Sequence, residues 1–310
     1  MSPAQRRRKF RERRVVKKSV KPRFIKLCIG FLILMGSLWF LYSSIWRGAD
    51  AKISLVISST ESDVRVVTFD PSLNEVTNIL IPGDTQVNVA RGLGSWKIKS
   101  VWQLGVNEGL DGQLLKETII KNFHFPITSW AGDSASGFIG GGTSGLVKAL
   151  VLPYKTNLKL SERLKIAQIY LKAKNTRRVD IDLSQTQTLT KSRLTDGSVG
   201  FILTGQISEK LIVAFSDKNM SKEGANLIIR DLSGSSNSLN EISSTLEVLG
   251  AKVAASLSEE SQDIDCIVFA HKKQYAVGLA KVLSCSVSEE PPTGSFDIEL
   301  VLGSAFARRF

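Results

Sequence analysis

The chain has 310 residues, a formal net charge of +12, two histidines and three cysteines. Because the histidines and cysteines are so few and do not cluster, a zinc site of the usual spacing is excluded and a histidine-dependent hydrolytic triad lacks support. Three cysteines also exclude a disulfide-stapled scaffold.

The positive charge is concentrated at the N-terminus. Residues 1–26 contain twelve Lys or Arg against the single acid Glu12, which gives a net charge of +11 and leaves about +1 for residues 27–310. A basic stretch beside a membrane segment attracts anionic lipid headgroups. Nucleic acid is the alternative partner, and we do not expect it because neither aromatic interleaving nor a folded reader accompanies the basic residues.

Residues 27–46 form an apolar segment without Lys, Arg, Asp or Glu. Twenty helical residues extend about 30 Å, which is the thickness of the hydrocarbon core of a bilayer. The excess of Lys and Arg before this segment predicts a cytoplasmic N-terminus. A cleaved signal peptide is the alternative, but its apolar region is usually shorter. We therefore expect a single-pass cell-membrane protein whose bulk is extracytoplasmic.

The patterns after the span predict a mixed fold of the α/β and α+β classes. Alternating β-branched residues and turn signals indicate three opening strands. Helical spacing and cap residues indicate two helices, the first capped by Asp111 and the second by Ser161. A turn at 194–199 joins two short strands, and residues 217–224 read as a polar linker. The expected elements are strands at 52–58, 64–70, 75–81 and 179–183 and helices at 111–123 and 162–174.

The last third of the chain is more regular. It predicts a compact β-α-β-β-α-β module, with Ser238 and Glu241 as a capping box for its first helix. The expected elements are strands at 226–230, 251–256, 265–270 and 296–302 and helices at 239–249 and 273–284. The expected domains are a tail (1–26), a transmembrane helix (27–46), an extracytoplasmic α/β domain (47–218) and a C-terminal domain (219–310).

The cysteines fall in different settings. Cys28 lies in the predicted span, Cys266 in a predicted strand and Cys285 at the end of a predicted helix. We expect free thiols at Cys266 and Cys285, and the alternative is that they form one disulfide in an oxidising exterior.

Two acids at neighbouring strand ends are the candidate metal ligands. Asp63 precedes the second expected strand and Asp84 follows the third, so the two carboxylates could hold Mg²⁺ beside a pyrophosphate. The G-x-G-x-x-G match at 140–145 has no βαβ unit around it and no P-loop lysine after it, which favours a loop that leads into a helix. His124 lies in an apolar stretch, so we expect it to be packed.

The run from Lys52 to Trp130 resembles the start of the LytR-CpsA-Psr (LCP) domain. The shared features are the strand that ends Phe69-Asp70-Pro71, the Ile-Pro-x-Asp-Thr element at 81–85, and the helix at 111–123 followed by Phe125-Pro126-Ile127. Residues 226–306 resemble the LytR C-terminal domain through LIIRDLSGSS, LEVLGAKV, AVGLAKVL and DIELVLGSAF. The resemblance implies an extracytoplasmic enzyme that moves glycopolymers from a polyprenyl-pyrophosphate carrier to the cell wall.

Two departures from the family pattern each remove a cation. Glu61 stands where the family has Arg two residues before its Asp, and Gly83 replaces the Arg of Ile-Pro-Arg-Asp-Thr. Phosphoryl transfer depends on cations that neutralise the oxygens, and the loss of one such donor commonly costs ~10²–10³ in rate. We therefore expect a degenerate LCP-like domain that binds wall glycan or envelope proteins without catalysis.

The competing hypothesis is an active glycopolymer transferase. It would use Asp63 and Asp84 with Mg²⁺ and recruit other cations, for which the candidates are Arg65, Arg91 and Arg177. A third hypothesis makes the protein a regulator whose basic tail meets nucleic acid.

Overall fold

The computed structural model describes residues 30–33, 35–37, 39, 51–58, 63–140, 142–234 and 236–310. The chain divides into two compact units, Met1–Arg47 and Gly48–Phe310. The predicted tail, most of the predicted span and Glu61 fall outside the described residues. No described helix is both long enough and apolar enough to cross a bilayer. The boundary predicted between residues 218 and 219 lies inside the second unit and stays a prediction.

The first sheet of the second unit has five strands in the order β6-β1-β2-β3-β7. Its centre is an antiparallel meander, and the three strands predicted for it are confirmed. β6 runs parallel to β1, and β7, also predicted, runs parallel to β3. The strands are β1 (Ile53–Ser58), β2 (Val64–Asp70), β3 (Glu75–Ile81), β6 (Ser129–Ala131) and β7 (Arg178–Asp182).

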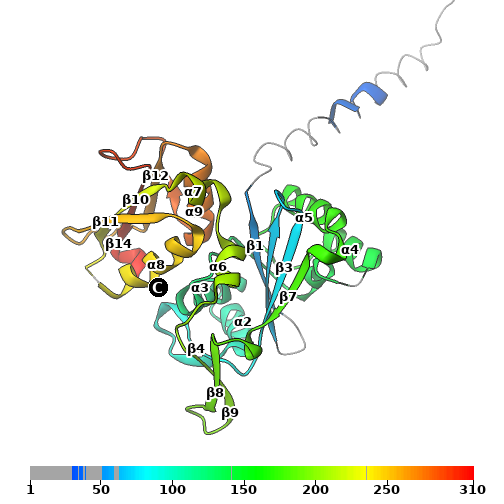
Figure 1. The fold of residues 1–310 in the computed structure, drawn as a ribbon, viewed down its shortest axis with the longest axis horizontal. Helices are drawn as coiled ribbons and strands as arrows, with labels where there is room; N and C mark the ends of the chain where they lie inside the picture. The colour runs from blue at the N-terminus through cyan, green and yellow to red at the C-terminus, as the bar shows by residue number, and fades with distance from the viewer. Residues whose placement is uncertain are drawn as a thin grey trace, which may run out of the picture. The chain divides into compact units, whose positions relative to one another are not determined.

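Helices cover both faces of this sheet (Figure 1). Val64 and Val66 of β2 belong to one buried cluster with residues of α2 and α3, while Val67 and Phe69 belong to another with residues of α4 and α5. Two buried faces explain why β2 reads as a nearly continuous apolar run. The covering elements are α2 (Ile98–Asn107), α3 (Gly112–Phe123), the short helix η4 (Asp133–Phe138), α4 (Gly142–Val151) and α5 (Leu160–Lys172).

The two predicted helices exist, but their caps differ from expectation. Asp111 is the N-cap residue of α3, yet its carboxylate pairs with Lys155 at 2.6 Å and makes no cap hydrogen bond. The predicted cap Ser161 lies inside α5, whose N-cap is Lys159. Glu162 accepts a hydrogen bond from the backbone N–H of Lys159 at 2.9 Å. The helix therefore begins at Leu160, before the predicted cap residue.

Two small antiparallel sheets and several short helices complete the first part of the unit. The hairpin predicted around 194–199 is confirmed as β8 and β9. The elements are β4 (Gln86–Asn88), η3 (Ala90–Gly92), β5 (Ser95–Lys97), η5 (Asn175–Arg177), η6 (Leu183–Gln185), β8 (Leu189–Arg193), β9 (Val199–Leu203) and α6 (Glu209–Phe215).

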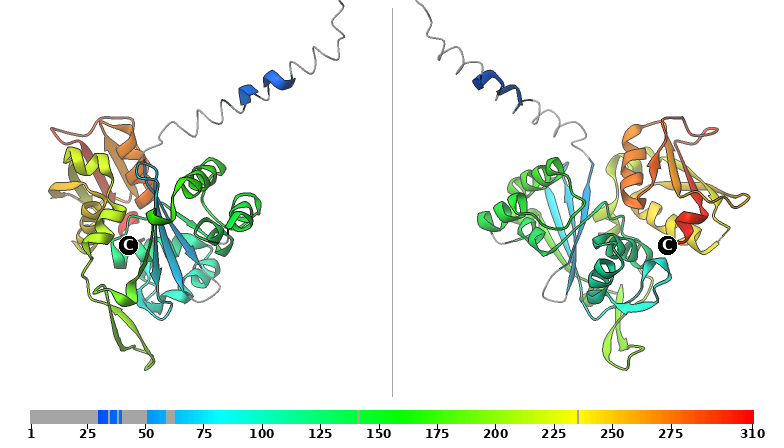
Figure 2. Two further views of the ribbon diagram at one scale, coloured as in Figure 1. Left: turned by 45° about the vertical axis from the view of Figure 1, so that its right-hand side comes forward. Right: turned by 180° about the vertical axis from the view of Figure 1, so that it is seen from behind.

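The second sheet has the order β11-β10-β14-β12-β13 and confirms the predicted β-α-β-β-α-β succession, with β13 as an added edge strand. Figure 2 shows this part of the chain, in yellow to red, from two further sides. β10 is parallel to β11 and β14, and β12 is antiparallel to β14. The elements are β10 (Asn226–Leu232), α8 (Ser236–Leu249), β11 (Lys252–Ser258), β12 (Cys266–Ala270), α9 (Lys273–Leu283), β13 (Ser286–Val287), β14 (Ile298–Gly303) and α10 (Ser304–Ala307).

Two local predictions around this sheet were wrong. The expected polar linker at 217–224 is the helix α7 (Lys218–Glu223), because Asp217 accepts hydrogen bonds from the N–H groups of Asn219 and Met220, both at 2.9 Å. The capping box at Ser238 was also wrong, since α8 already begins at Ser236.

The expectation of free thiols was wrong as well, because Cys266 and Cys285 form a disulfide with 4.9 Å between their Cα atoms. β13 pairs with β12 directly after α9, and this pairing brings the end of the helix back beside the first residue of β12. The sequence pattern placed Cys266 in its strand and Cys285 just after its helix, and the disulfide between them was the alternative to the free thiols that we expected.

Helix α3 joins the two sheets through buried charged side chains. Lys116, 1% exposed, donates to the carbonyl of Lys281 at 2.6 Å and to the hydroxyl of Ser284 at 3.1 Å. Glu117, also 1% exposed, pairs with Arg91 at 2.7 Å and with Arg309 at 3.3 Å. Burial lowers the pKa of Lys116 to about 7. A lysine without an adjacent water shell favours its neutral form.

Candidate functional site

The candidate site lies where β2 begins and β3 ends. Val64 is the register partner of Ile81, so Asp63, just before β2, and the turn just after β3 meet at one edge of the first sheet. The Oδ1 atom of Asp63 accepts a hydrogen bond from the backbone N–H of Gly83 at 2.9 Å. The structure thus brings the Asp63 and Asp84 segments together, as their strand-end positions suggest.

Asp84 is exposed, and its carboxylate already has a cation beside it. Lys99, in the first turn of α2, places its Nζ atom 2.7 Å from Oδ1 of Asp84. The backbone fixes this approach, since the N–H of Lys99 donates to the carbonyl of Gly83 at 3.2 Å. The carbonyl of Asp84 in turn accepts from the N–H of Phe201 at 3.2 Å. The turn at 82–85 is therefore held between α2 and β9.

This arrangement does not fit the proposed Mg²⁺ pair. Mg²⁺ requires oxygen ligands in near-octahedral geometry and usually takes one or two carboxylates together with phosphate oxygens and waters. Here one oxygen of Asp63 holds a backbone N–H, and Lys99 occupies the cation position beside Asp84. Within the described part of the chain, no three His, Cys, Asp or Glu side chains gather to hold a metal ion.

Two of the three candidate arginines are held elsewhere. Arg91 has a left-handed backbone, with φ of 64°, and makes two bonds to Glu117, at 2.7 and 3.0 Å. Arg177 donates to the backbone carbonyl of Leu73. Both side chains therefore stabilise the fold and leave the carboxylate edge without their charge.

Arg65 is the third candidate and behaves differently. It lies two residues after Asp63 on β2, so the two side chains share one face of the strand. Its Nε atom is buried and has no hydrogen-bond partner among the described residues. A buried donor without a partner is costly and commonly marks a missing ligand or water.

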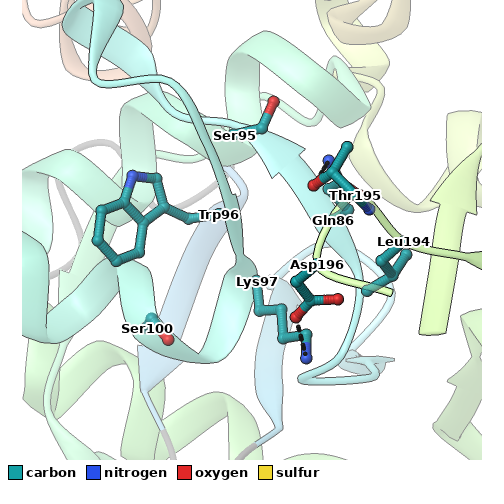
Figure 3. A pocket seen from close by; sticks show the side chains of 8 residues that line it. All are labelled: Gln86, Ser95, Trp96, Lys97, Ser100, Leu194, Thr195 and Asp196. Atoms are coloured by element: carbon teal, nitrogen blue, oxygen red, sulfur yellow. Dashed lines mark hydrogen bonds and ion pairs between the residues drawn. The ribbon is translucent and has the colours of Figure 1, made fainter. Parts of the chain in front are cut away.

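A cavity of about 200 Å³ lies next to the Asp84 turn, and we call it the Trp96 cavity (Figure 3). Its lining residues come from β4, β5, the start of α2 and the β8–β9 turn: Gln86, Ser95, Trp96, Lys97, Ser100, Leu194, Thr195 and Asp196. Sequence reasoning missed it because its two walls are far apart in the chain, as Gln86 and Thr195 are at 109 residues. The one usable signal was a tryptophan in a glycine-rich stretch.

The charged residues of this cavity form a close pair. The Nζ atom of Lys97 lies 2.8 Å from Oδ2 of Asp196. The hydrogen bond that Lys97 donates to Asp196 raises the pKa of Lys97, and the same bond, together with those that Ser198 donates, lowers the pKa of Asp196. Both groups are therefore ionised at neutral pH, and their charges cancel locally.

A second cavity, of about 450 Å³, lies over β2, β3, β7 and α6. Val179, Ile181 and Val213 contribute to its apolar wall, and Lys52 pairs with Asp70 at its rim at 3.3 Å. Asp70 ends β2, whereas Asp63 precedes it, so this cavity lies toward the opposite end of the strand from the carboxylate pair.

The comparisons with known proteins give only distant structural similarity. No protein-family model and no curated protein matches the chain. The crystal structure of B. subtilis TagV has 13% identity and a TM-score of 0.40, and the match covers 66% of this chain and 99% of that one.

Two other solved structures resemble the chain to a similar degree. B. subtilis TagT has 15% identity and a TM-score of 0.36, with 53% of this chain and 87% of that one covered. A transcriptional regulator from Enterococcus faecalis has 12% identity and a TM-score of 0.39, with 66% and 90% covered. Similarity at this level transfers no activity to the chain.

Proposed function

We propose that the chain is a single-pass membrane protein of the cell envelope that presents its extracytoplasmic region, from residue 47, to the cell wall and binds wall glycan or an envelope protein without catalysing transfer. The apolar segment at 27–46 would cross the membrane, and the basic tail would contact anionic lipid on the cytoplasmic side. In this proposal residues 47–218 are a degenerate LCP-like domain and residues 219–310 are a LytR C-terminal-like domain.

The main support for this proposal is that the carboxylates of Asp63 and Asp84 are both engaged in contacts that hold the turn. Transfer from a pyrophosphate needs cations placed to neutralise the developing charge. At this edge Asp63 holds the N–H of Gly83, and Lys99 is engaged by Asp84. Arg91 is held by the buried carboxylate of Glu117. The carboxylates thus stabilise a turn, and among the described residues Lys99 and Arg91 are already paired with acids, which favours binding over catalysis.

Sedimentation with purified cell walls tests the binding function. The full chain in mild detergent is mixed with wall sacculi in about 1 M salt, where the Debye length falls to about 3 Å and attraction by the basic tail is screened. We expect the protein in the pellet, both with and without residues 1–26. Loss of binding in salt, or on removal of the tail, would show that only the tail adheres and would overturn the proposal.

The orphaned Nε atom of Arg65 favours one second candidate, the active transferase. In that case Arg65 would donate to a phosphate oxygen beside Asp63. Arg65→Gln should then lower transfer by roughly 10²–10³ while the free energy of unfolding stays near that of an Arg193→Gln control, whose side chain lies on the exposed β8–β9 hairpin. Equal losses of activity and stability in Arg65→Gln would argue against this candidate.

A further inference from the structure

Helix α5 is apolar on two faces, and only one of them packs against the first sheet. Ile166 and Ile169 are buried in the cluster that this helix shares with β1 and β2. Leu160 and Leu171, each 65% exposed, and Leu164, also exposed, lie on a different face. At 3.6 residues per turn, these three leucines fall within about 40° of arc around the helix. A surface helix normally turns polar residues outward, so an outward stripe of leucines indicates a second partner.

The neighbouring helix α4 also exposes apolar side chains. Val151 is 75% exposed, and Val147, one helical turn earlier, is exposed on the same side of α4. Figure 1 shows α4 and α5 as the outermost elements on their side of the first sheet, and in Figure 2 no described element of the second unit lies beyond these green helices. We call the exposed apolar residues here the α4–α5 face: Val147, Val151, Leu152, Leu160, Leu164 and Leu171.

Positive charge is concentrated along the same stretch of chain. Residues 142–178 contain nine Lys or Arg against the single acid Glu162, which gives a net charge of +8. Because residues 27–310 together have a net charge of about +1, the others in that range have about −7. Glu162 itself pairs with Lys281, which comes from outside the stretch, at 2.5 Å. The positive charge of the second unit is therefore segregated on and beside α4 and α5.

Exposed leucines flanked by lysines are typical of helices that lie on a lipid bilayer. The leucines enter the boundary between headgroups and acyl chains, and the lysine ammonium groups attract anionic headgroups. A dissolved polyanion would be held by the cations alone and would leave the aligned leucines in water. A protein partner would have to supply both acids and a matching apolar groove, whereas an anionic bilayer supplies both chemistries in one surface.

We propose that the α4–α5 face is a second membrane contact of this chain and binds the surface of an anionic lipid bilayer. Its leucines insert at the headgroup boundary, and the exposed Lys148, Lys159 and Lys174 bind anionic headgroups. This inference rests on the proposed single-pass anchor, because a tethered bilayer is present at high effective concentration and a small face can then bind it. The contact gives the extracytoplasmic region one preferred orientation on the membrane.

A fluorescent probe on the face tests this contact in the full chain. Cys28→Ser removes the thiol of the span, and Cys266 and Cys285 form a disulfide, so Leu164→Cys supplies the one free thiol. The chain is labelled there with an environment-sensitive dye and reconstituted into vesicles of phosphatidylcholine and phosphatidylglycerol that carry spin labels on their acyl chains. We expect a blue-shifted emission that the spin labels quench. The matched control is Val199→Cys, exposed on the β8–β9 hairpin, whose probe should stay in water.

Two sets of substitutions measure the leucine and lysine contributions, and all of them change exposed side chains. In the labelled chain, Leu160→Gln with Leu171→Gln should lower the ratio of membrane-bound to free face by roughly tenfold. Lys148→Gln with Lys159→Gln should lower it by roughly fivefold for each lysine in the anionic vesicles. The control Lys191→Gln, exposed on the β8–β9 hairpin, should leave the ratio unchanged.

The outcomes separate this contact from the proposed function. Equal quenching at positions 164 and 199, or quenching at 164 that is as strong in pure phosphatidylcholine, would overturn the contact with anionic lipid. A blue shift when dextran sulfate is added to the protein in detergent, with none in anionic vesicles, would assign the face to a polyanion instead. If alkaline carbonate leaves the chain in the vesicles while the probe at 164 stays in water, the contact is wrong and the anchor stands. If carbonate extracts the chain, the proposed anchor itself fails, and the contact fails with it.

Discussion

The buried ammonium group of Lys116 should make the free energy of unfolding depend on pH between about pH 7 and pH 10.5. This group is buried between α3 and the end of α9, and burial lowers its pKa from 10.5 to about 7. The folded state therefore binds fewer protons than the unfolded state between these two values. Stability must rise with pH across that window, because the penalty of a buried charge is present below the folded pKa and is relieved above it.

The size of this effect follows from the linkage relation. A pKa near 7 in the folded state and an ordinary lysine pKa in the unfolded state predict a gain of about 2 kcal/mol in the free energy of unfolding between about pH 7 and about pH 9. Lys116→Met keeps the length of the side chain and removes the titration, so its stability should be flatter over the same range. Urea unfolding of both proteins, followed by tryptophan fluorescence, measures the difference.

The control is Lys281→Met, whose ammonium group is about half exposed and pairs with Glu162 on the surface. It should leave the slope of the wild type unchanged, because exposed pairs contribute little. Parallel pH profiles for the wild type and Lys116→Met would refute the claim that Lys116 is desolvated at the junction of the two sheets.

Three further outcomes follow from the contacts described above. Arg91→Gln should lower the free energy of unfolding by about 3 kcal/mol, because it removes one partner from the buried carboxylate of Glu117. Thermal unfolding measures this loss, and a much smaller loss would show that Arg309 alone neutralises Glu117. Replacing Cys266 and Cys285 by serine should cost about 3 kcal/mol for the loop that they close, measured by urea unfolding against the oxidised wild type, while the reduced wild type should match the variant. Mg²⁺ at millimolar concentration should not raise the melting temperature, and an increase that Asp63→Asn or Asp84→Asn abolishes would contradict the fit described for these carboxylates.

The sequence was sufficient where structure depends on local pattern. The strands β1, β2 and β3 carry β-branched runs between strong turn signals, and the structure places them within a residue of the prediction. The β-α-β-β-α-β succession was predictable for the same reason. Cap positions were less so, because Glu162 and Asp217 form hydrogen bonds that start helices where composition suggested loops or later starts.

Features that depend on the pairing of distant segments could not be decided from local sequence pattern. The Cys266–Cys285 bond needs the register of β12 and β13, and the Trp96 cavity needs a hairpin more than a hundred residues away. Arg91 was a reasonable candidate cation in sequence. Its partner Glu117 is a buried acid on α3, and helical periodicity alone does not predict that a charged residue of this helix faces inward.

The central claim is that the protein binds the cell wall without transferring glycan to it, and an assay that measures binding and transfer together tests this most directly. The full chain in detergent is incubated with purified cell wall and a polyprenyl-pyrophosphate donor that carries a radiolabelled glycan, and the label is counted in the lipid and wall fractions. A binding protein without transferase activity should sediment with the wall while the label stays in the lipid fraction. Label that moves to the wall with the wild type, and fails to move with Asp63→Ala or Asp84→Ala of unchanged stability, would contradict the account.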